Sequence, residues 1–219
     1  MKIFILSVFM IFCFSGFIKS QENYNKKQFS LLISGGTCFN SPAGYYFFRE
    51  TDNKLFNPGL YGSLGIEYGP HKIVELTQLF FSVSVAYTKV STSEFDLNYF
   101  PSTAKLTIET IPILFWGKLQ TDTRLSPFVE IGIGYSKLNF IEKYSNNSLN
   151  GTSFNYWALG YGFGAGLNYR FSESFELALG AQSLSNENEN IVENDRDHKS
   201  GIAVRNEVNP IYLRLKIKF

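Results

Sequence analysis

The chain has 219 residues, of which 17% are aromatic and 18% are charged, and its formal net charge is +1. This near balance gives no electrostatic case for nucleic acid as a partner, and a mean hydropathy of −0.07 is too low for a helical membrane protein. The same hydropathy suits a β-barrel in lipid, in which only every second strand residue faces the membrane.

The first part of the chain has the pattern of a secretion signal. Lys2 supplies one positive charge, and an almost unbroken apolar run follows from Ile3 to Phe14, with small residues after it. The run has the length of a signal-peptide core and is too short to span a bilayer comfortably. We therefore expect residues 1–20 to be a signal peptide, cleaved before Gln21 or, as a second choice, after Gly16.

The remaining residues, 21–219, have the length of one domain. Cys38 is the single cysteine left after cleavage, which excludes an intramolecular disulfide in the exported protein.

Apolar and polar residues alternate with period two in successive segments of this domain, which is the signature of strands with one apolar and one polar face. The alternation predicts strands at Phe29–Phe39, Gly59–Tyr68, Leu76–Val90, Ala104–Lys118, Pro127–Leu138, Phe154–Arg170, Phe175–Leu184 and Asn209–Phe219. The last of these sets charged residues such as Arg214 against an apolar face that includes Leu213 and Leu215. That combination predicts a barrel with lipid outside and a wet interior.

The fourth predicted strand, Ala104–Lys118, is less regular, because Ile111 and Ile113 blur its alternation. We expect Pro112 where no ladder hydrogen bond is needed, and Glu109 in the interior. The lipid face of this strand is expected to carry Leu106, Ile108, Leu114 and Trp116. Aromatic residues near strand ends are expected to form the interfacial girdles, for example Tyr87, Trp116, Trp157 and Tyr169.

The sixth predicted strand carries a row of glycines, Gly160, Gly162, Gly164 and Gly166. The run superficially matches a dinucleotide-binding loop, but its strict period of two and the absence of a following helix favour a strand. Inward glycines would make room for bulky side chains from neighbouring strands and let the wall curve.

The connections between the predicted strands alternate long and short. The long ones are Asn40–Pro58, Ser91–Thr103, Asn139–Ser153 and Ser185–Val208, and the short ones are the turn Gly69–Pro70 and the segments Gln120–Ser126 and Phe171–Ser174. With the amino terminus in the periplasm, every long loop falls outside the cell, which is the asymmetry of outer-membrane barrels. We predict an all-β fold, an eight-stranded antiparallel up-and-down transmembrane β-barrel. At this size side chains fill the interior, so no open pore is expected.

Two neighbouring strands carry a resemblance to a known family. Ile108–Leu114, a short turn and then Ser126–Gly134 resemble the paired strands of the outer membrane protein β-barrel domain family, the small barrels often labelled "porin family". The resemblance implies a bacterial outer-membrane protein that contacts outer-membrane lipid, expected as a monomer. It also implies that Phe219 is the signal read by the outer-membrane insertion machinery. It supplies no catalytic, cofactor-binding or metal-binding residues.

Charged residues fall on the predicted inner face, namely Glu67, Glu109, Glu130, Glu176, Arg170, Arg214 and Lys216. They could suggest an ion path or a carboxylate pair. Buried charges in a narrow barrel persist chiefly when they are paired and hydrogen-bonded, so we favour a structural plug. The sequence does not say which acid meets which base.

Three functions stay open at this level. We expect a structural, adhesive or surface-binding role through the long outer loops, with no identified extracellular ligand. The alternatives are an outer-membrane lipid-modifying enzyme and, less favoured, a soluble ligand-carrying barrel. An enzyme would need a base and a nucleophile held together near the outer leaflet, and the only histidines are His71, expected in a periplasmic turn, and His198. Neither histidine has a recognisable partner for that chemistry, so we expect no enzyme. The acids of Glu187–Asp197 show no metal-ligand spacing, so we expect no metal, and we expect no cofactor.

Overall fold

The computed structural model describes residues 28–40, 56–74, 76–97, 100–144, 153–192 and 201–219. The strands are β1 (Gln28–Asn40), β2 (Phe56–Val74), β3 (Thr77–Thr92), β4 (Phe95–Leu97), β5 (Phe100–Thr121), β6 (Leu125–Tyr144), β7 (Ser153–Arg170), β8 (Phe175–Val192) and β9 (Gly201–Lys218). The expected signal peptide, residues 1–20, lies outside these ranges. No helix long and apolar enough to cross a membrane occurs within them.

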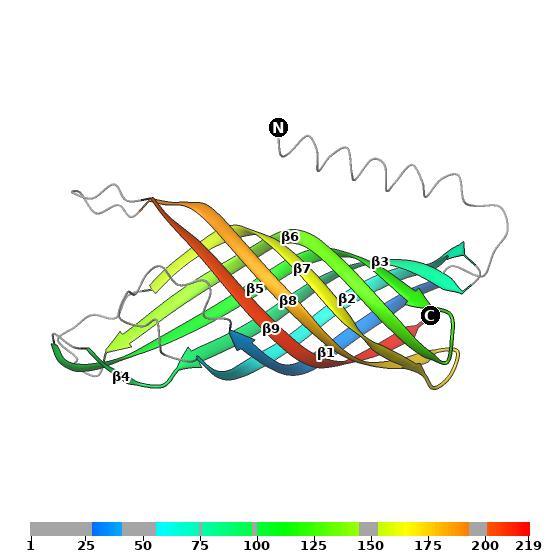
Figure 1. Ribbon diagram of the computed structural model, residues 1–219, viewed down its shortest axis with the longest axis horizontal. Helices are drawn as coiled ribbons and strands as arrows, with labels where there is room; N and C mark the ends of the chain where they lie inside the picture. Colours follow the sequence, from blue (N-terminus) through cyan, green and yellow to red (C-terminus); the bar gives the residue numbers. More distant parts are fainter. Residues whose placement is uncertain (1–27, 41–55, 75, 98–99, 145–152, 193–200) are drawn as a thin grey trace.

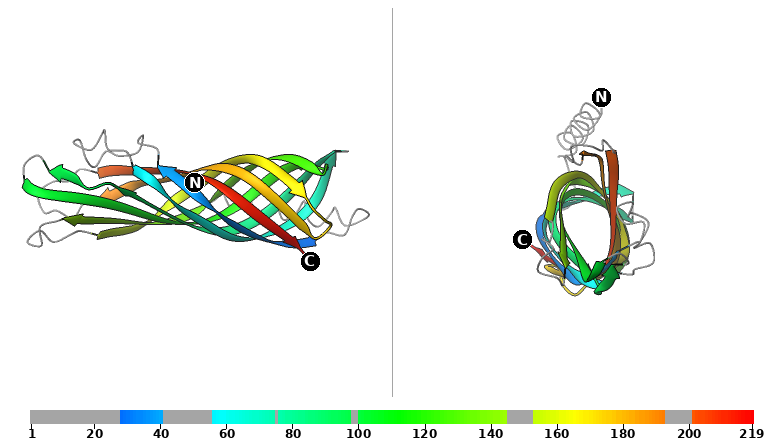
Figure 2. Two further views of the ribbon diagram at one scale, coloured as in Figure 1. Left: turned by 90° about the horizontal axis from the view of Figure 1, so that it is seen from below. Right: turned by 90° about the vertical axis from the view of Figure 1, so that its left-hand side faces the viewer.

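The strands close into a ring, seen along its axis in Figure 2. Strands that follow one another pair antiparallel from β1 to β3 and from β5 to β9, while β3–β5 and β1–β9 complete the circle. The short strand β4 continues along β5 where the β3–β5 ladder stops, so β3 and β4 share one place in the wall. The result is a barrel of eight antiparallel wall strands, as predicted.

The two faces of the wall differ in chemistry. On β9, Leu213 is 55% exposed on the outside, whereas its neighbours Tyr212 and Arg214 are buried inside. Exposed leucine, isoleucine, valine and phenylalanine side chains recur in this way on every strand from β1 to β3 and from β5 to β9. A continuous apolar belt around a polar interior is the surface of a barrel that sits in a bilayer.

The two ends of the barrel are unlike. At one end the connections are 75–76, 122–124 and 171–174, and we call it the short-turn end; it also holds the carboxyl terminus (Figure 1). The opposite end carries connections 41–55, 98–99, 145–152 and 193–200, and we call it the long-loop end. Three of these connections, 41–55, 145–152 and 193–200, are longer than any at the short-turn end, as predicted, whereas the predicted loop Ser91–Thr103 is largely strand and its connection 98–99 is short.

The strands run further toward the long-loop end than the polar sequence suggested. The ladder between β5 and β6 reaches the pair Ala104 and Tyr144, and that between β8 and β9 reaches Val192 and Gly201. These residues lie in or at the edges of segments predicted as loops. Polar side chains do not prevent a ladder, because its hydrogen bonds come from the backbone.

One predicted turn is wrong. Gly69–Pro70 lies inside β2, where the register with β3 shifts between Tyr68 and His71, and the chain reverses only at 75–76. Gly69 has φ +153°, a backbone conformation that side chains with a Cβ rarely adopt. The glycine and proline therefore mark a bulge in a strand.

The facing of the fourth predicted strand, which is β5, is also wrong. Ile108, Leu114 and Trp116 are buried inside, while Phe115 is exposed on the outside and Glu109 faces outward with it. The stretch is apolar on both faces, so its own sequence does not show which face points into the barrel. The register with β3 and β6, whose faces are unambiguous, decides it. Trp116 therefore belongs to no girdle, whereas Tyr87 and Trp157 are exposed on the outer surface as expected.

The outward face of β9 generates a stability prediction. Leu213→Arg should lower the free energy of unfolding by about 2–4 kcal/mol, because it places a charge in the hydrocarbon region. Asn209→Arg is the matched control on the same strand and face, outside the apolar belt, and should cost about 0–1 kcal/mol. Urea titration of protein folded into lipid vesicles measures both. Equal effects of the two substitutions would contradict the lipid-facing assignment of Leu213.

The barrel interior as candidate functional site

The interior near the short-turn end is built around Glu67 of β2. Its carboxylate lies 2.5 Å from Lys118 Nζ of β5 and 2.5 Å from Lys216 Nζ of β9. None of these strands is a neighbour of another in the ring, so the ion pairs pass through the interior. All three side chains are buried.

A second carboxylate, Glu176 of β8, continues the network. It forms an ion pair with Lys218, lies 3.7 Å from Lys216 Nζ and 3.5 Å from Arg170 Nε, and accepts a 2.5 Å hydrogen bond from Asn168 Nδ2. Lys216 thus bridges the acids Glu67 and Glu176. Its position between them gives one cation two counter-charges.

The third buried carboxylate, Glu130 of β6, has four hydrogen-bond donors. Arg214 Nη1 and Nη2 donate to its two oxygens at 2.8 and 2.9 Å, Tyr212 Oη donates at 2.9 Å and Gln182 Nε2 donates at 2.6 Å. Tyr61 Oη of β2 in turn donates to Gln182 Oε1 at 3.1 Å. This fork of guanidinium and carboxylate is the strong geometry for such a pair.

Aromatic rings separate the two groups of charges. Lys216 Nζ lies 4.2 Å and Lys118 Nζ 4.7 Å from the centroid of the Phe80 ring, and the Arg214 guanidinium carbon lies 5.9 Å from that of Phe128. Cations at these distances over a ring face are attracted by its quadrupole. The rings fill space between the charges and hold the cations in place.

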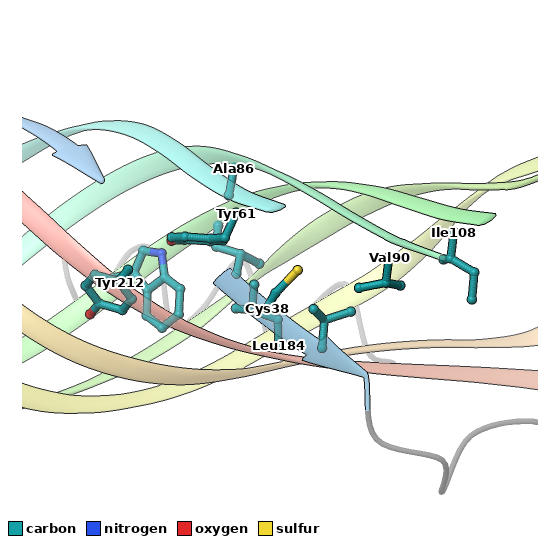
Figure 3. Close-up of a cluster of buried hydrophobic side chains, with 10 residues drawn as sticks. Cys38, Tyr61, Ala86, Val90, Ile108, Leu184 and Tyr212 are labelled. Atoms are coloured by element: carbon teal, nitrogen blue, oxygen red, sulfur yellow. The ribbon is translucent and has the colours of Figure 1, made fainter. Parts of the chain in front are cut away.

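Toward the long-loop end the interior becomes largely apolar. Figure 3 shows side chains from several strands gathered along the barrel, from Tyr212 at one end of the cluster to Val90 and Ile108 at the other. Trp116 lies in this cluster and donates its Nε1 hydrogen to Ser84 Oγ at 2.9 Å. Among the described residues the cluster consists of Cys38, Tyr61, Ala86, Val90, Ile108, Leu114, Trp116, Leu184, Val208 and Tyr212.

The row of glycines faces the bulky rings of this core. A Cβ added at Gly162 would lie 2.5 Å from Trp116 Cη2, and one at Gly132 would lie 2.7 Å from the same ring. A Cβ at Gly166 would likewise lie 2.7 Å from Phe128 Cζ. The glycines therefore make room for large side chains, as the sequence predicted, and their run lies within strand β7.

The interior confirms most of the charged residues that the sequence placed there. Glu67, Glu130, Glu176, Arg214 and Lys216 are buried inside and paired. Each buried charged side chain among the described residues belongs to an ion pair, which agrees with a structural plug.

Two other charged residues depart from the prediction. Glu109 faces outward, where its Oε1 lies 2.9 Å from Lys89 Nζ. Lys118 was missed as an interior cation because β5 was assigned the opposite facing. Alignment of the β5 pattern on Pro112 and Lys118, instead of on its apolar residues, would have placed it inside.

The two histidines and the acidic segment are the remaining candidates. His71 lies in β2, and its ring centroid is 5.4 Å from that of Tyr68 and 5.7 Å from that of Phe81. His198 and residues 193–197 of the acidic segment lie outside the described residues. Within those residues no group of histidine, cysteine, aspartate and glutamate could hold a metal ion.

Comparisons with known proteins agree with this architecture. Residues 18–205 match the family described as "Outer membrane protein beta-barrel domain". No curated protein matches in sequence. Among solved structures, a major outer membrane protein from Thermus thermophilus is similar in fold, with TM-score 0.50, 13% identity and coverage of 89% of this chain and 100% of that chain.

Two further similar structures have lower TM-scores. Neisserial surface protein A gives TM-score 0.49 at 12% identity, covering 90% of this chain and 100% of that chain. The attachment invasion locus protein Ail of Yersinia pestis, in complex with the heparin analogue sucrose octasulfate, gives TM-score 0.42 at 11% identity, covering 88% and 97%.

The Glu130–Arg214 pair generates a double-mutant prediction. Glu130→Gln or Arg214→Gln alone should each cost about 3–5 kcal/mol, because either leaves a buried charge without its partner. The double variant should cost less than the sum of the two. Lys89→Gln, which breaks a half-exposed outer pair, is the control and should cost at most about 1 kcal/mol. Additive losses in urea titrations in lipid would show that the two interior groups do not interact.

The close approach of Trp116 to β7 generates another prediction. Gly162→Ala should destabilise the barrel by about 1–3 kcal/mol, because the added methyl overlaps the indole ring. Gly117→Ala is the control, since a Cβ at that outward position meets no atom within 4 Å. The same urea titration compares them, and in a Trp157→Phe background the fluorescence of Trp116 should change only in the Gly162 variant. A neutral Gly162→Ala would mean that the ring does not press on β7.

Proposed function

We propose that this chain, which belongs to the outer membrane protein β-barrel domain family, acts as a monomeric surface-binding or adhesive protein through its long-loop end. Its location is the bacterial outer membrane. The barrel anchors the protein, and the strands and connections of the long-loop end form the binding structure outside the cell.

The observation that carries this proposal is the length of the strands. A strand that crosses a bilayer needs about 9–11 residues. β6 has 20 residues and continues from the belt residue Tyr135 to Tyr144, which adds about 30 Å of strand at about 3.3 Å per residue. The wall is thus prolonged well past the apolar belt, and it projects a paired rim that a mere membrane anchor would not need.

The termini support the orientation of the barrel. β1 begins and β9 ends at the short-turn end, where the exposed Phe219 donates its backbone N–H to Phe29 O at 3.1 Å. A periplasmic amino terminus places this end in the periplasm and the long-loop end outside. We further propose that Phe219, on the seam where β1 meets β9, is the signal read by the insertion machinery.

The interior supports a closed barrel. Contacts such as Arg214–Glu130 and Tyr61–Gln182 join strands that are not adjacent in the ring, and the apolar cluster fills the interior toward the long-loop end. Moving ions through this space would require breaking paired buried charges, which is costly. A non-enzymatic role fits the same residues, since His71, the one histidine within the described ranges, packs among aromatic rings near the short-turn end.

The proposal is tested by trimming the rim without disturbing the membrane part. Asn186 and Asn206 are partners in the β8–β9 ladder, so the residues between them can be replaced by an Asn-Gly turn. Cells displaying the trimmed protein should lose adhesion to at least one surface in a panel coated with different proteins and polysaccharides. The control replaces connection 171–174 at the opposite end in the same way and should adhere like wild type.

Folding of each variant is checked by SDS gel electrophoresis of unheated samples, in which a folded barrel migrates differently from the heated, unfolded protein. A folded, surface-exposed trimmed protein that adheres as well as wild type to every one of these surfaces would contradict a binding role for the β8–β9 rim. Loss of adhesion in the control as well would point to a general defect of the barrel.

A further inference from the structure

Four lysines gather on the outer wall at the long-loop end, and we call them the lysine patch: Lys89, Lys105, Lys137 and Lys143. They come from the adjacent wall strands β3, β5 and β6, and the ladders place all four on the outward face. Glu109 is the only acid among the described outward side chains of these strands, and one further exposed acid, Glu94, follows β3 beside the patch. The patch therefore carries a clear excess of positive charge.

The register makes this excess of positive charge destabilising when no anion is bound. Lys105 and Lys143 are direct partners in the β5–β6 ladder, and like charges in directly opposite positions destabilise a sheet. Glu109 is engaged by Lys89 at 2.9 Å. No ion pair among the described residues includes Lys105, Lys137 or Lys143. An anion bound from outside would relieve this repulsion.

The patch begins where the apolar belt ends. Lys137 follows Tyr135 by two residues on β6 and is the ladder partner of Trp157, and both aromatic side chains are more than half exposed. Exposed tyrosine and tryptophan rings mark the boundary between hydrocarbon and headgroups. Lys137 therefore lies at the level of lipid headgroups.

The patch then extends outward beyond an ordinary headgroup layer. Lys143 lies six residues further along β6, which is about 20 Å of strand and about 15 Å of height at a tilt of about 40°. Headgroups add only about 5–8 Å to each side of the hydrocarbon core. The lysines thus match a lipid whose anionic groups are carried on sugars that rise well above the glycerol or acyl level.

The described side chains of the other wall strands do not share this charge. In the long-loop half, the described outward side chains of β7, β8, β9 and β1 include no cation, and Glu207 of β9 accepts a hydrogen bond from Ser183 at 3.0 Å. Among the described side chains, the positive cluster therefore lies on one side of the barrel.

We propose that the lysine patch binds a phosphate-bearing glycolipid of the leaflet at the long-loop end. Lys137 and Lys89 face phosphates near the membrane boundary, and the opposed pair Lys105 and Lys143 holds a phosphate further out between two ammonium groups. This inference rests on the membrane location of the barrel and does not depend on the adhesive role proposed above.

The test uses the full barrel in nanodiscs of phosphatidylcholine with a small fraction of lipid A carrying a phosphorylated sugar core, and native mass spectrometry to count bound glycolipid. The double variant Lys105→Gln/Lys143→Gln should bind it about 25-fold more weakly, at about five-fold per lysine, which corresponds to about 1 kcal/mol for each charge near an anionic surface. Lys72→Gln, an exposed lysine at the short-turn end, is the matched control and should change binding less than two-fold. Added salt should weaken wild-type binding.

A second measurement separates lost binding from lost folding. In discs of phosphatidylcholine alone, the double variant should resist urea at least as well as wild type, because the repulsion between the opposed lysines is gone. In discs with glycolipid, wild type should gain stability and the double variant should not. Relief of repulsion thus raises the stability of the double variant without glycolipid, whereas loss of the binding site removes the stability that glycolipid adds.

Several results would overturn the proposal. Undiminished glycolipid binding by the double variant, or an equal loss in Lys72→Gln, would show that the patch is not the site. Equal affinity for dephosphorylated glycolipid would exclude phosphate as the recognised group. Equally tight binding of the soluble phosphorylated sugar or of heparin, in discs without glycolipid, would make the patch a site for soluble polyanions instead.

Discussion

The need to satisfy every backbone hydrogen bond in lipid is the constraint on which this structure depends. A bilayer offers no water to unpaired N–H and C=O groups, so a spanning sheet must have no edge. The β1–β9 ladder meets that need by joining the first and last strands of the chain. Once the ring is closed, its two faces have separate environments, and the strict alternation of side chains along each strand follows from that separation.

Closure with eight wall strands also dictates the interior. A ring of this size leaves only enough room for side chains, so the interior must be packed like a protein core although its short-turn half holds charged residues. Charges meet this demand by pairing across the interior, as Glu130 does with Arg214. Large side chains fill the interior where small residues face them, because Trp116 occupies the space left by Gly132 and Gly162. The interior is thus filled, and the binding that we propose is placed on surfaces outside it.

Those surfaces arise because the ladders do not stop at the membrane boundary. Paired strands beyond the belt keep a fixed register, so side chains on the rim are held in defined positions and not scattered over loose loops. The opposed lysines at 105 and 143 are one consequence, since only a continued ladder places them face to face. Under the two proposals above, the outer wall would contact a lipid from the side and the rim an extracellular surface from above.

The sequence by itself determined the fold class, the number of wall strands, the facing of most of them and the unequal ends, because each depends on period-two patterning that is local to a strand. It could not determine the facing of β5, which is apolar on both faces; the ladders with β3 and β6 decided it, and with it the interior place of Lys118. It also misread Gly69–Pro70, since a bulge and a turn use the same residues. The sequence also could not predict that Glu67 pairs with Lys118 and Lys216. A local pattern shows on which side of the wall a charged residue lies. Its ion-pair partner across the barrel depends on the register of the closed ring, which sets which residues of distant strands lie at the same height.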